Sequence, residues 1–315
     1  MSRFIVRRIA QGIPLLLVIS VLVFALIHLA PGGPLSTYLE NPNVRPEDIA
    51  RLRKAMGLDQ PLSVQYLSWL LAFVRGDWGY SYADGRPVLD RLVERIPATL
   101  ELVGSACVMG LIAAVPAGIF AAVSRRFDRV TSVFAVAGIS LPVFWFGLVL
   151  QLVFAGALGW LPSSGRASFD GGGLADRVAH LVLPALVLAA ALSSAWSRYL
   201  RRAMRDTIAR PFMRAARSRG LTERTLLLHH ALPNALPTFV TVVLLDVSMM
   251  ASGAVVTESI FAWPGIGGLF TEALAKRDYT VLMAFLMCGS LAVMTLNLLA
   301  DVAVYLLGPR TRDAA

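Results

Sequence analysis

The sequence predicts an all-α membrane protein that crosses the bilayer six times. Its 315 residues are 57% hydrophobic with a mean hydropathy of +0.66, which is far too apolar for a soluble domain. The apolar residues gather in runs of about 20, long enough for a helix to cross the hydrocarbon core. The net charge is +9. In such a protein this excess indicates cytoplasmic loops beside anionic headgroups, so we infer no nucleic-acid binding from it.

The amino-terminal part predicts one span followed by a long polar segment. Residues 1–30 hold an arginine-rich tail and an apolar run over 13–30. That run exceeds a usual signal core and is followed by no small-x-small cleavage site, so we expect it to be retained. Residues 31–98 are expected outside the membrane on the extracytoplasmic side, with short helices over 46–56 and 63–73.

Residues 99–309 are expected to form the transport core, followed by a cytoplasmic tail over 310–315. The five remaining spans are expected over residues 99–123, 130–158, 181–199, 234–257 and 281–307. A basic turn over 124–129 separates the second and third spans. The third span is expected to kink at Pro142, because proline interrupts the helical hydrogen-bond ladder.

Residues 200–233 form the one long basic interruption between apolar segments. The fourth span is predicted to continue into it as an amphipathic helix with Leu200, Met204 and Ile208 on one face. The interruption is expected to end at Pro233, where the fifth span begins. Its composition alone also fits an ordinary positive-inside loop.

Within this stretch the spacing predicts two short helices. Pro211 suits a first helical turn, and the spacing places Phe212, Ala215 and Ala216 on one face. Gly220 can adopt the left-handed conformation that ends a helix, and the threonine two residues later can cap the next one. A small-residue face suits close docking on another protein. The flanking arginines, suited to an acidic rim or lipid phosphates, are Arg210, Arg214, Arg217 and Arg219.

Charge distribution predicts that both termini are cytoplasmic. With six spans, the cytoplasmic segments hold 17 arginines and the two short outer loops hold four basic residues. The long first loop is not counted, because long loops translocate regardless of charge.

Carboxylates at membrane depth are costly, so each calls for a partner or a role. Asp246 lies in the fifth expected span. It either accepts a structural hydrogen bond, from Ser248, Ser252 or a serine of the fourth span, or forms a polar wall of a translocation path. The residues leave both interpretations open. Glu101 and Glu258 lie near span ends and are expected at the interface.

An outer loop over 258–280 contains a Trp-Pro-Gly sequence that cannot remain helical. Phe261 and Trp263, beside Pro264 and Gly265, are expected to plug or line a cavity shielded by protein. The alternative is a simple aromatic anchor at the membrane interface.

No enzyme motif is present in the sequence. It contains no phosphate-binding loop and no zinc or nucleophile signature, so we expect no metal and no cofactor in this chain. His229 and His230 are adjacent and therefore point apart on a helix. Cys107 and Cys288 lie in apolar runs and are expected to be buried.

Several phrases resemble the permease subunits of binding-protein-dependent ABC importers. Ala215-Ala216, Gly220 and Leu232-Pro233 resemble the family's EAA motif, although Arg214 stands where the pattern has glutamate. An arginine there is similar to the dipeptide/oligopeptide branch. The phrases GLDQPL at 57–62, GDWG at 76–79, RIPATL at 95–100 and WPGIG at 263–267 also resemble that branch.

The resemblance implies a fold, a site and partners. Spans two to six would form the permease core, and the basic stretch would couple to an ATPase through Arg214, Ala215, Ala216, Arg217, Arg219, Gly220 and Leu221. The chain would be the longer of two paired permeases in a bacterial or archaeal cytoplasmic membrane. Its partners would be a homologous permease, two ATPase subunits that bind ATP and Mg²⁺, an extracytoplasmic binding protein and lipids. The solute would be peptides, glutathione or a nickel chelate.

Two rival functions remain from the residues. An ion-coupled secondary transporter needs its own coupling site and often shows inverted repeats. The sequence offers Asp246 and no repeat. An intramembrane hydrolase needs a nucleophile and a base, and no such pair is evident.

Overall fold

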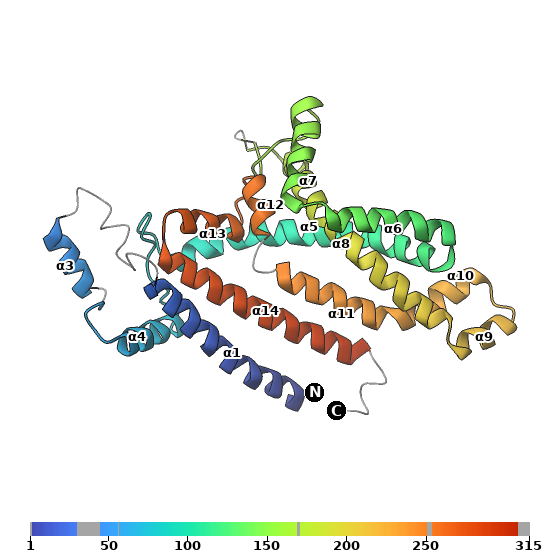
Figure 1. Cartoon of the computed structure of the whole chain (residues 1–315), viewed down its shortest axis with the longest axis horizontal. Helices are drawn as coiled ribbons and strands as arrows, with labels where there is room; N and C mark the ends of the chain where they lie inside the picture. Colours follow the sequence, from blue (N-terminus) through green and yellow to red (C-terminus); the bar gives the residue numbers. More distant parts are fainter. Residues whose placement is uncertain (1, 30–44, 56, 169–170, 251–253, 308–315) are drawn as a thin grey trace.

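A computed structural model describes residues 2–29, 45–55, 57–168, 171–250 and 254–307, and the residues described are almost all helical (Figure 1). The helices are α1 (Ser2–Leu29), α3 (Pro46–Ala55), α4 (Leu62–Val74), α5 (Val88–Val123), α6 (Arg125–Ser140), α7 (Val143–Leu150), α8 (Leu174–Ile208), α9 (Pro211–Ser218), α10 (Glu223–Thr225), α11 (Leu232–Met250), α12 (Val255–Ile260), α13 (Ile266–Ala275) and α14 (Tyr279–Leu307), with π-helical turns η2 (Gln151–Ala157) and η3 (Leu226–Ala231). The expected short helices of the first loop are confirmed as α3 and α4.

Among the described residues, five helices are long and apolar enough to cross a membrane. They are α1, α5, α8, the continuous unit from α10 to α11, and α14. A sixth span arises if α6 and α7 with η2 count as one, although the two parts meet at 97°. The expected kink at Pro142 is therefore a break. The all-α expectation is confirmed, and six spans agree with this count.

Helix boundaries differ from expectation on both sides of the second span. α5 begins at Val88, eleven residues before the expected start, and passes through Pro97 and Pro116 without ending. Prolines are tolerated inside membrane helices where neighbouring groups satisfy the freed carbonyls. The expected six-residue basic turn reduces to Ser124, because α6 starts at Arg125.

The core lies where α5 packs along α8. Trp196 of α8 is part of this core and is 0% exposed. Glycines of α5 permit this close approach: a Cβ at Gly110 would lie 3.2 Å from Trp196, and one at Gly118 would lie 2.9 Å from Leu200. The predicted continuation of the fourth span is confirmed, since α8 runs unbroken to Ile208 with Leu200 and Met204 fully buried.

The fifth span differs from expectation at both ends. Pro233 does not separate it from the basic stretch, because α10, η3 and α11 form one continuous helical unit. The π-helical turn η3 precedes this proline, and such turns accommodate local loss of the regular ladder. The helical unit begins at Glu223, eleven residues before the expected start at 234, and ends at Met250, seven residues before the expected end at 257, where the separate short helix α12 lies instead.

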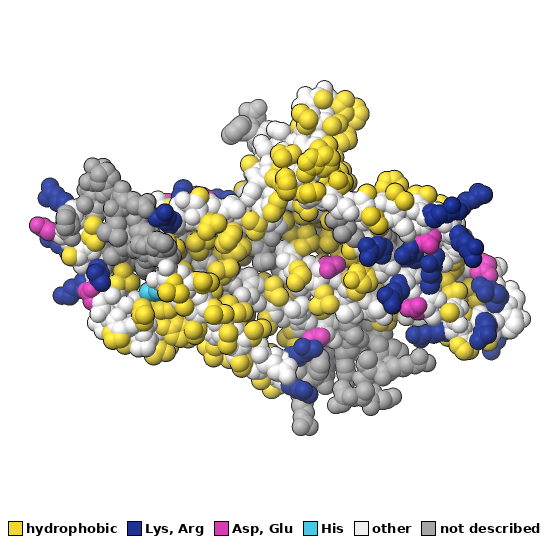
Figure 2. Space-filling view, in the orientation of Figure 1, with side chains coloured by type: hydrophobic (Ala, Val, Ile, Leu, Met, Phe, Trp, Pro, Cys, Tyr) yellow, Lys and Arg dark blue, Asp and Glu magenta, His cyan; other side chains and the backbone are white. Residues whose placement is uncertain are grey.

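The long helices place two polar regions at opposite ends of the molecule. α9 and α10 lie at one end, and α3, α4 and α13 lie toward the other (Figure 1). Between them the visible surface is largely apolar, while lysine and arginine side chains gather at the end formed by α9, α10 and the start of α6 (Figure 2).

Candidate functional site

α9 and its flanks have the predicted local geometry. Pro211 occupies the first turn, and Gly220 has a φ of +80°, the left-handed region that favours glycine. The hydroxyl of Thr222 accepts a hydrogen bond from the backbone N–H of Thr225 at 3.3 Å. This cap satisfies one of the unpaired donors that begin a helix. The sequence therefore predicted both helix boundaries here.

The two faces of α9 are divided differently from the sequence expectation. Met213 is 2% exposed, and the half-buried Ala216 packs beside it against the core of its own chain. Phe212 is 39% exposed and Ala215 is also exposed. The expectation that both alanines share the face of Phe212 is therefore wrong. Ala216 packs inside its own chain, whereas Ala215 and Phe212 remain exposed to solvent.

We call Phe212, Ala215, Arg219 and Leu221 the α9 outer face. All four are exposed, and nothing lies within 4 Å of a Cβ placed on the adjoining Gly220. Exposed arginines border this face. The face thus offers a small apolar patch inside a basic rim, which is the surface expected to meet an acidic partner.

Asp246 has a partner that sequence reasoning did not identify. The indole N–H of Trp196 donates a hydrogen bond to its Oδ2 at 2.7 Å. Ser248 instead donates to the carbonyl of Leu244, and Ser252 lies outside the described residues. A tryptophan can bury its ring in the core and still present one donor, so the membrane carboxylate is tied to α8.

Glu258, expected near a span end, is a fully buried carboxylate of α12. It is 0% exposed. Its Oε1 accepts from the hydroxyl of Thr99 at 2.8 Å, and its Oε2 accepts from the backbone N–H of Gly268 at 2.9 Å. A Cβ at Gly265 or Gly267 would lie closer than 3.0 Å to this carboxylate. The glycines of the Trp-Pro-Gly region therefore leave the space that a buried glutamate occupies.

The aromatic residues of the outer loop are part of the protein core. Phe261 and Trp263 are each 1% exposed. The indole N–H of Trp263 donates to the carbonyl oxygen of Ala98 at 2.8 Å, and the N–H of Gly165 donates to the carbonyl of Phe261 at 2.8 Å. Ala262 between them has a φ of 45°, an uncommon conformation for a non-glycine residue. An interfacial anchor has to reach the headgroups, and these buried rings do not.

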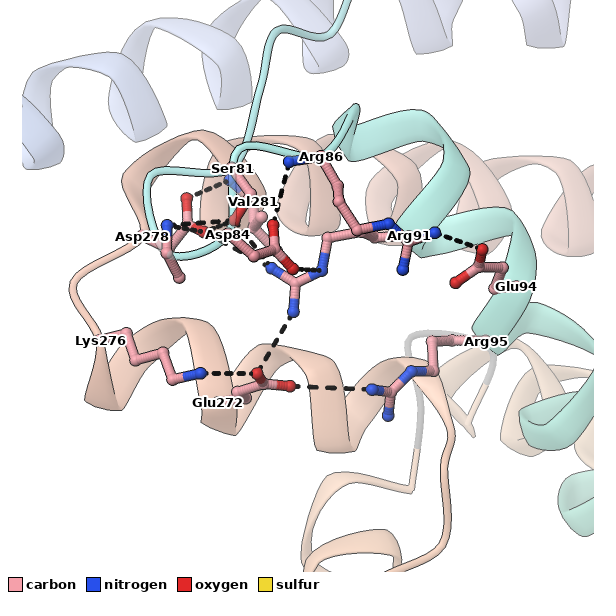
Figure 3. A network of polar contacts seen from close by, with 11 residues as sticks. Ser81, Asp84, Arg86, Arg91, Glu94, Arg95, Glu272, Lys276, Asp278 and Val281 are labelled. Atoms are coloured by element: carbon pink, nitrogen blue, oxygen red, sulfur yellow. Dashed lines mark hydrogen bonds and ion pairs between the residues drawn. The ribbon is translucent and has the colours of Figure 1, made fainter.

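A charged network at the same end joins segments far apart in the chain (Figure 3). Arg91 of α5 is 6% exposed. Its guanidinium lies 3.5 Å from Asp84, 3.3 Å from Glu272 and 3.6 Å from the fully buried Asp278. Ser81 also donates a hydrogen bond to Asp278. The network thus fastens the first loop to α5, α13 and the start of α14.

Two arginines hold Glu101, one from the loop before α8 and one from the first turn of α8. Arg166 and Arg177 lie 2.5 Å and 2.9 Å from its carboxylate. The sequence signal for these pairs was only that arginines are scarce in the outer loops. Pairing between residues 65 or more positions apart depends on the packing of α5 against α8, which the sequence pattern does not encode locally.

These features describe a class of protein: a multi-pass helical membrane protein with a basic stretch at one end and a Trp-Pro-Gly loop held in the core. The comparisons make the class specific. Residues 114–313 match the family described as the binding-protein-dependent transport system inner membrane component, and residues 1–103 match its amino-terminal component. The chain belongs to this family of ABC importer permeases. The rival ion-coupled function gains no support from the comparisons.

Full-length relatives agree with this assignment. The chain is 36% identical over 315 residues to the oligopeptide transport system permease protein AppB of Bacillus subtilis, covering 98% of this chain and 99% of that one. It is 36% identical over 314 residues to the glutathione transport system permease protein GsiC of Escherichia coli, covering 99% of each. The chain is therefore a permease subunit of an importer and lies in a bacterial-type inner membrane.

Solved structures share the fold. An inward-facing structure of the MetNI methionine ABC transporter matches with a TM-score of 0.57 and 17% identity, covering 70% of this chain and 98% of that chain. An amino acid ABC transporter structure matches with a TM-score of 0.54 and 14% identity, covering 69% and 94%. At these identities the likeness concerns the arrangement of helices alone.

Proposed function

We propose that this permease subunit imports peptides or glutathione in a complex driven by ATP hydrolysis in separate subunits. The observation that carries the substrate proposal is full-length similarity to both an oligopeptide permease and a glutathione permease. The two relatives are equally identical to this chain. We therefore propose that the solute is either a short peptide or glutathione, which is itself a small peptide with a thiol group.

The proposed partners are a homologous permease, two ATPase subunits, an extracytoplasmic binding protein and membrane lipids. The α9 outer face would enter a groove on an ATPase subunit, with the arginines at 214, 217 and 219 against an acidic rim. The exposure of Phe212, Ala215 and Leu221 supports this contact, since burying exposed apolar side chains in an interface lowers the free energy. ATP and Mg²⁺ would be ligands of those partners.

The proposed orientation puts both termini and residues 200–233 in the cytoplasm, with residues 31–98 and the outer loop outside. The gathering of basic side chains at the α9 end supports it (Figure 2). Cysteine labelling tests it in a version lacking Cys107 and Cys288. An impermeant thiol reagent should label Asp84→Cys in intact cells and Arg217→Cys only after lysis, and the reverse pattern would refute the orientation.

The proposed gate is the outer loop around Trp263, Pro264 and Gly265. Trp263 bonds to Ala98 of α5, and Phe261 packs with Leu183 of α8, which supports this role because a loop held to two spans has to move when they separate. Asp246 remains a proposed member of the translocation path, half-buried beside Trp196.

Reconstitution tests the function as a whole. The complete complex in liposomes, with ATP in the compartment that contains the ATPases and binding protein in the other, should accumulate labelled oligopeptide or glutathione. Uptake should stop without ATP or binding protein and should not respond to a proton or sodium gradient. Gradient-driven uptake by the chain alone would overturn the proposal.

A further inference from the structure

A groove of about 440 Å³ runs between α1 and α14 and belongs to none of the sites described above. On α14 its lining extends from Phe285 to Asp301. The sixteen residue-to-residue steps between these two positions rise about 24 Å along the helix. This exceeds one leaflet of a hydrocarbon core about 30 Å thick. The groove is therefore long enough to hold an extended acyl chain from the headgroup level to the bilayer centre.

The two ends of the groove differ in chemistry. Its lining residues toward the bilayer centre are mostly apolar. The hydroxyl of Ser290 in this part donates a hydrogen bond to the carbonyl of Leu286 in the same helix. Near the start of α1 and the end of α14 it is polar, with lining residues Arg8, Gln11, Asn297 and Asp301. A groove with a polar mouth and an apolar channel matches an amphipathic molecule, as a membrane lipid is.

Asn297 supplies an independent sign that the groove accepts a polar group. Its Oδ1 is shielded from solvent, yet within the described part of the chain it has no hydrogen-bond partner. Shielded polar atoms are nearly always paired, so an unpaired one at the wall of a groove calls for a donor that arrives from outside the chain. The donor has to come from the groove side, because Asn297 lines it.

The charges at the mouth select among lipids. Arg8 lies 2.9 Å from Asp301, so the mouth carries one positive and one negative group. Strongly basic pockets between membrane helices favour anionic lipids, but here a purely anionic headgroup would also meet the Asp301 carboxylate. A zwitterion satisfies both signs: its phosphate accepts from Arg8, and its ammonium donates to Asn297 and Asp301.

We propose that this groove binds one phospholipid with an ethanolamine headgroup. The acyl chain lies along the apolar wall, past Gly12, where the backbone of α1 lies against Met294 of α14. A Cβ there would lie closer than 3.0 Å to the thioether of Met294, so the glycine keeps the two helices in contact. Placement in the cytoplasmic leaflet rests on the proposed orientation, whereas binding itself does not.

Native mass spectrometry of the purified complex tests the proposal. The complex is placed in nanodiscs containing equal parts phosphatidylethanolamine and phosphatidylglycerol, then released and weighed. Wild type should retain one phosphatidylethanolamine per copy of this chain, in preference to phosphatidylglycerol. Asn297→Leu, which is close in size but has no acceptor, and Arg8→Gln should each reduce that retention about tenfold. Arg7→Gln is the matched control, because Arg7 is exposed and does not line the groove.

A second readout keeps folding apart from binding. Added phosphatidylethanolamine should raise the melting temperature of wild type and Arg7→Gln, but not that of Asn297→Leu. Equal retention of both lipids by every variant would overturn the proposal. So would a groove covered by the partner permease, detected as a crosslink from Val293→Cys to that subunit. Because lipid retention is measured without transport, a complex that retains the lipid but imports no peptide would refute only the proposed function.

Discussion

Ala215 and Ala216 are neighbours on α9, but Ala215 is exposed while Ala216 packs against the core of its own chain beside Met213. A large side chain at position 216 therefore acts first on this chain. A large side chain at position 215 acts on whatever docks outside. A substitution at position 215, and not one at position 216, therefore reports on a docking partner.

The space around Glu258 predicts the effect of a methyl group at Gly265. Gly265→Ala places a Cβ closer than 3.0 Å to the buried carboxylate, and overpacking of this kind costs about 1–3 kcal/mol. We expect a lower melting temperature in detergent. Gly104→Ala is the control, because its Cβ meets nothing within 4 Å inside α5. A Gly265→Ala protein as stable as the control would contradict the packing described for Glu258.

Trp263 should restrain the resting complex. Trp263→Ala removes a buried indole and its hydrogen bond to Ala98, a change that typically costs about 3–5 kcal/mol. We expect the loosened outer loop to raise ATP hydrolysis in the absence of substrate. Trp160→Ala removes a tryptophan that is 69% exposed and should leave basal hydrolysis unchanged. Unaltered hydrolysis in an intact Trp263→Ala complex would argue against a gating role.

The Trp196–Asp246 pair predicts unequal effects of two conservative changes. Asp246→Asn retains an oxygen that accepts from the indole, so its stability should fall little. Trp196→Phe leaves the half-buried carboxylate without its donor, and losing a hydrogen bond to a charged group costs about 1.5–3 kcal/mol. Thermal unfolding of both variants and of the double variant checks this. Equal and additive losses would mean that the hydrogen bond contributes nothing.

The network around Arg91 should weaken in acid. The hydrogen bond from Lys276, with further help from the nearby guanidinium groups, holds the pKa of Glu272 below its ordinary value of 4.5 despite partial burial. For Asp84, burial acts to raise the pKa, but the Arg86 N–H and nearby charges lower it overall. Groups with lowered pKa values stabilise the fold fully above their ordinary pKa, and that stability is lost as the pH falls through the lowered value.

Hydrogen exchange measures this loss directly. Amides of α13 and of the turn at Ser81 should be equally protected at pH 7 and pH 6, and should lose protection below about pH 4. Glu272→Gln should reduce the pH dependence while leaving the Asp84 contribution. Protection that is independent of pH down to 3 would contradict the role of the network.

The sequence predicted what is local and failed on what is tertiary. Apolar runs identified the spans, and the special conformations of Pro211 and Gly220 identified the limits of α9, because both signals depend on a few neighbouring residues. The hydrogen-bond partners of Asp246 and Glu258 were missed, since those partners lie on other helices. The face of Ala216 was missed for the same reason: spacing defines an angle around a helix but not which neighbour occupies it.

Retention of the ATPase subunits by α9 variants tests whether the α9 outer face docks on those subunits. Ala215→Leu enlarges a side chain on the α9 outer face, and Gly220→Val strains a residue whose φ is +80°. Overpacking a tight contact costs about 1–3 kcal/mol, or about a five- to 150-fold loss of affinity. Both variants should insert normally but lose co-purifying ATPase and transport, whereas the exposed neighbour variant Ala209→Leu retains both. Wild-type amounts of ATPase with normal transport in Ala215→Leu and Gly220→Val would contradict the assignment of this loop.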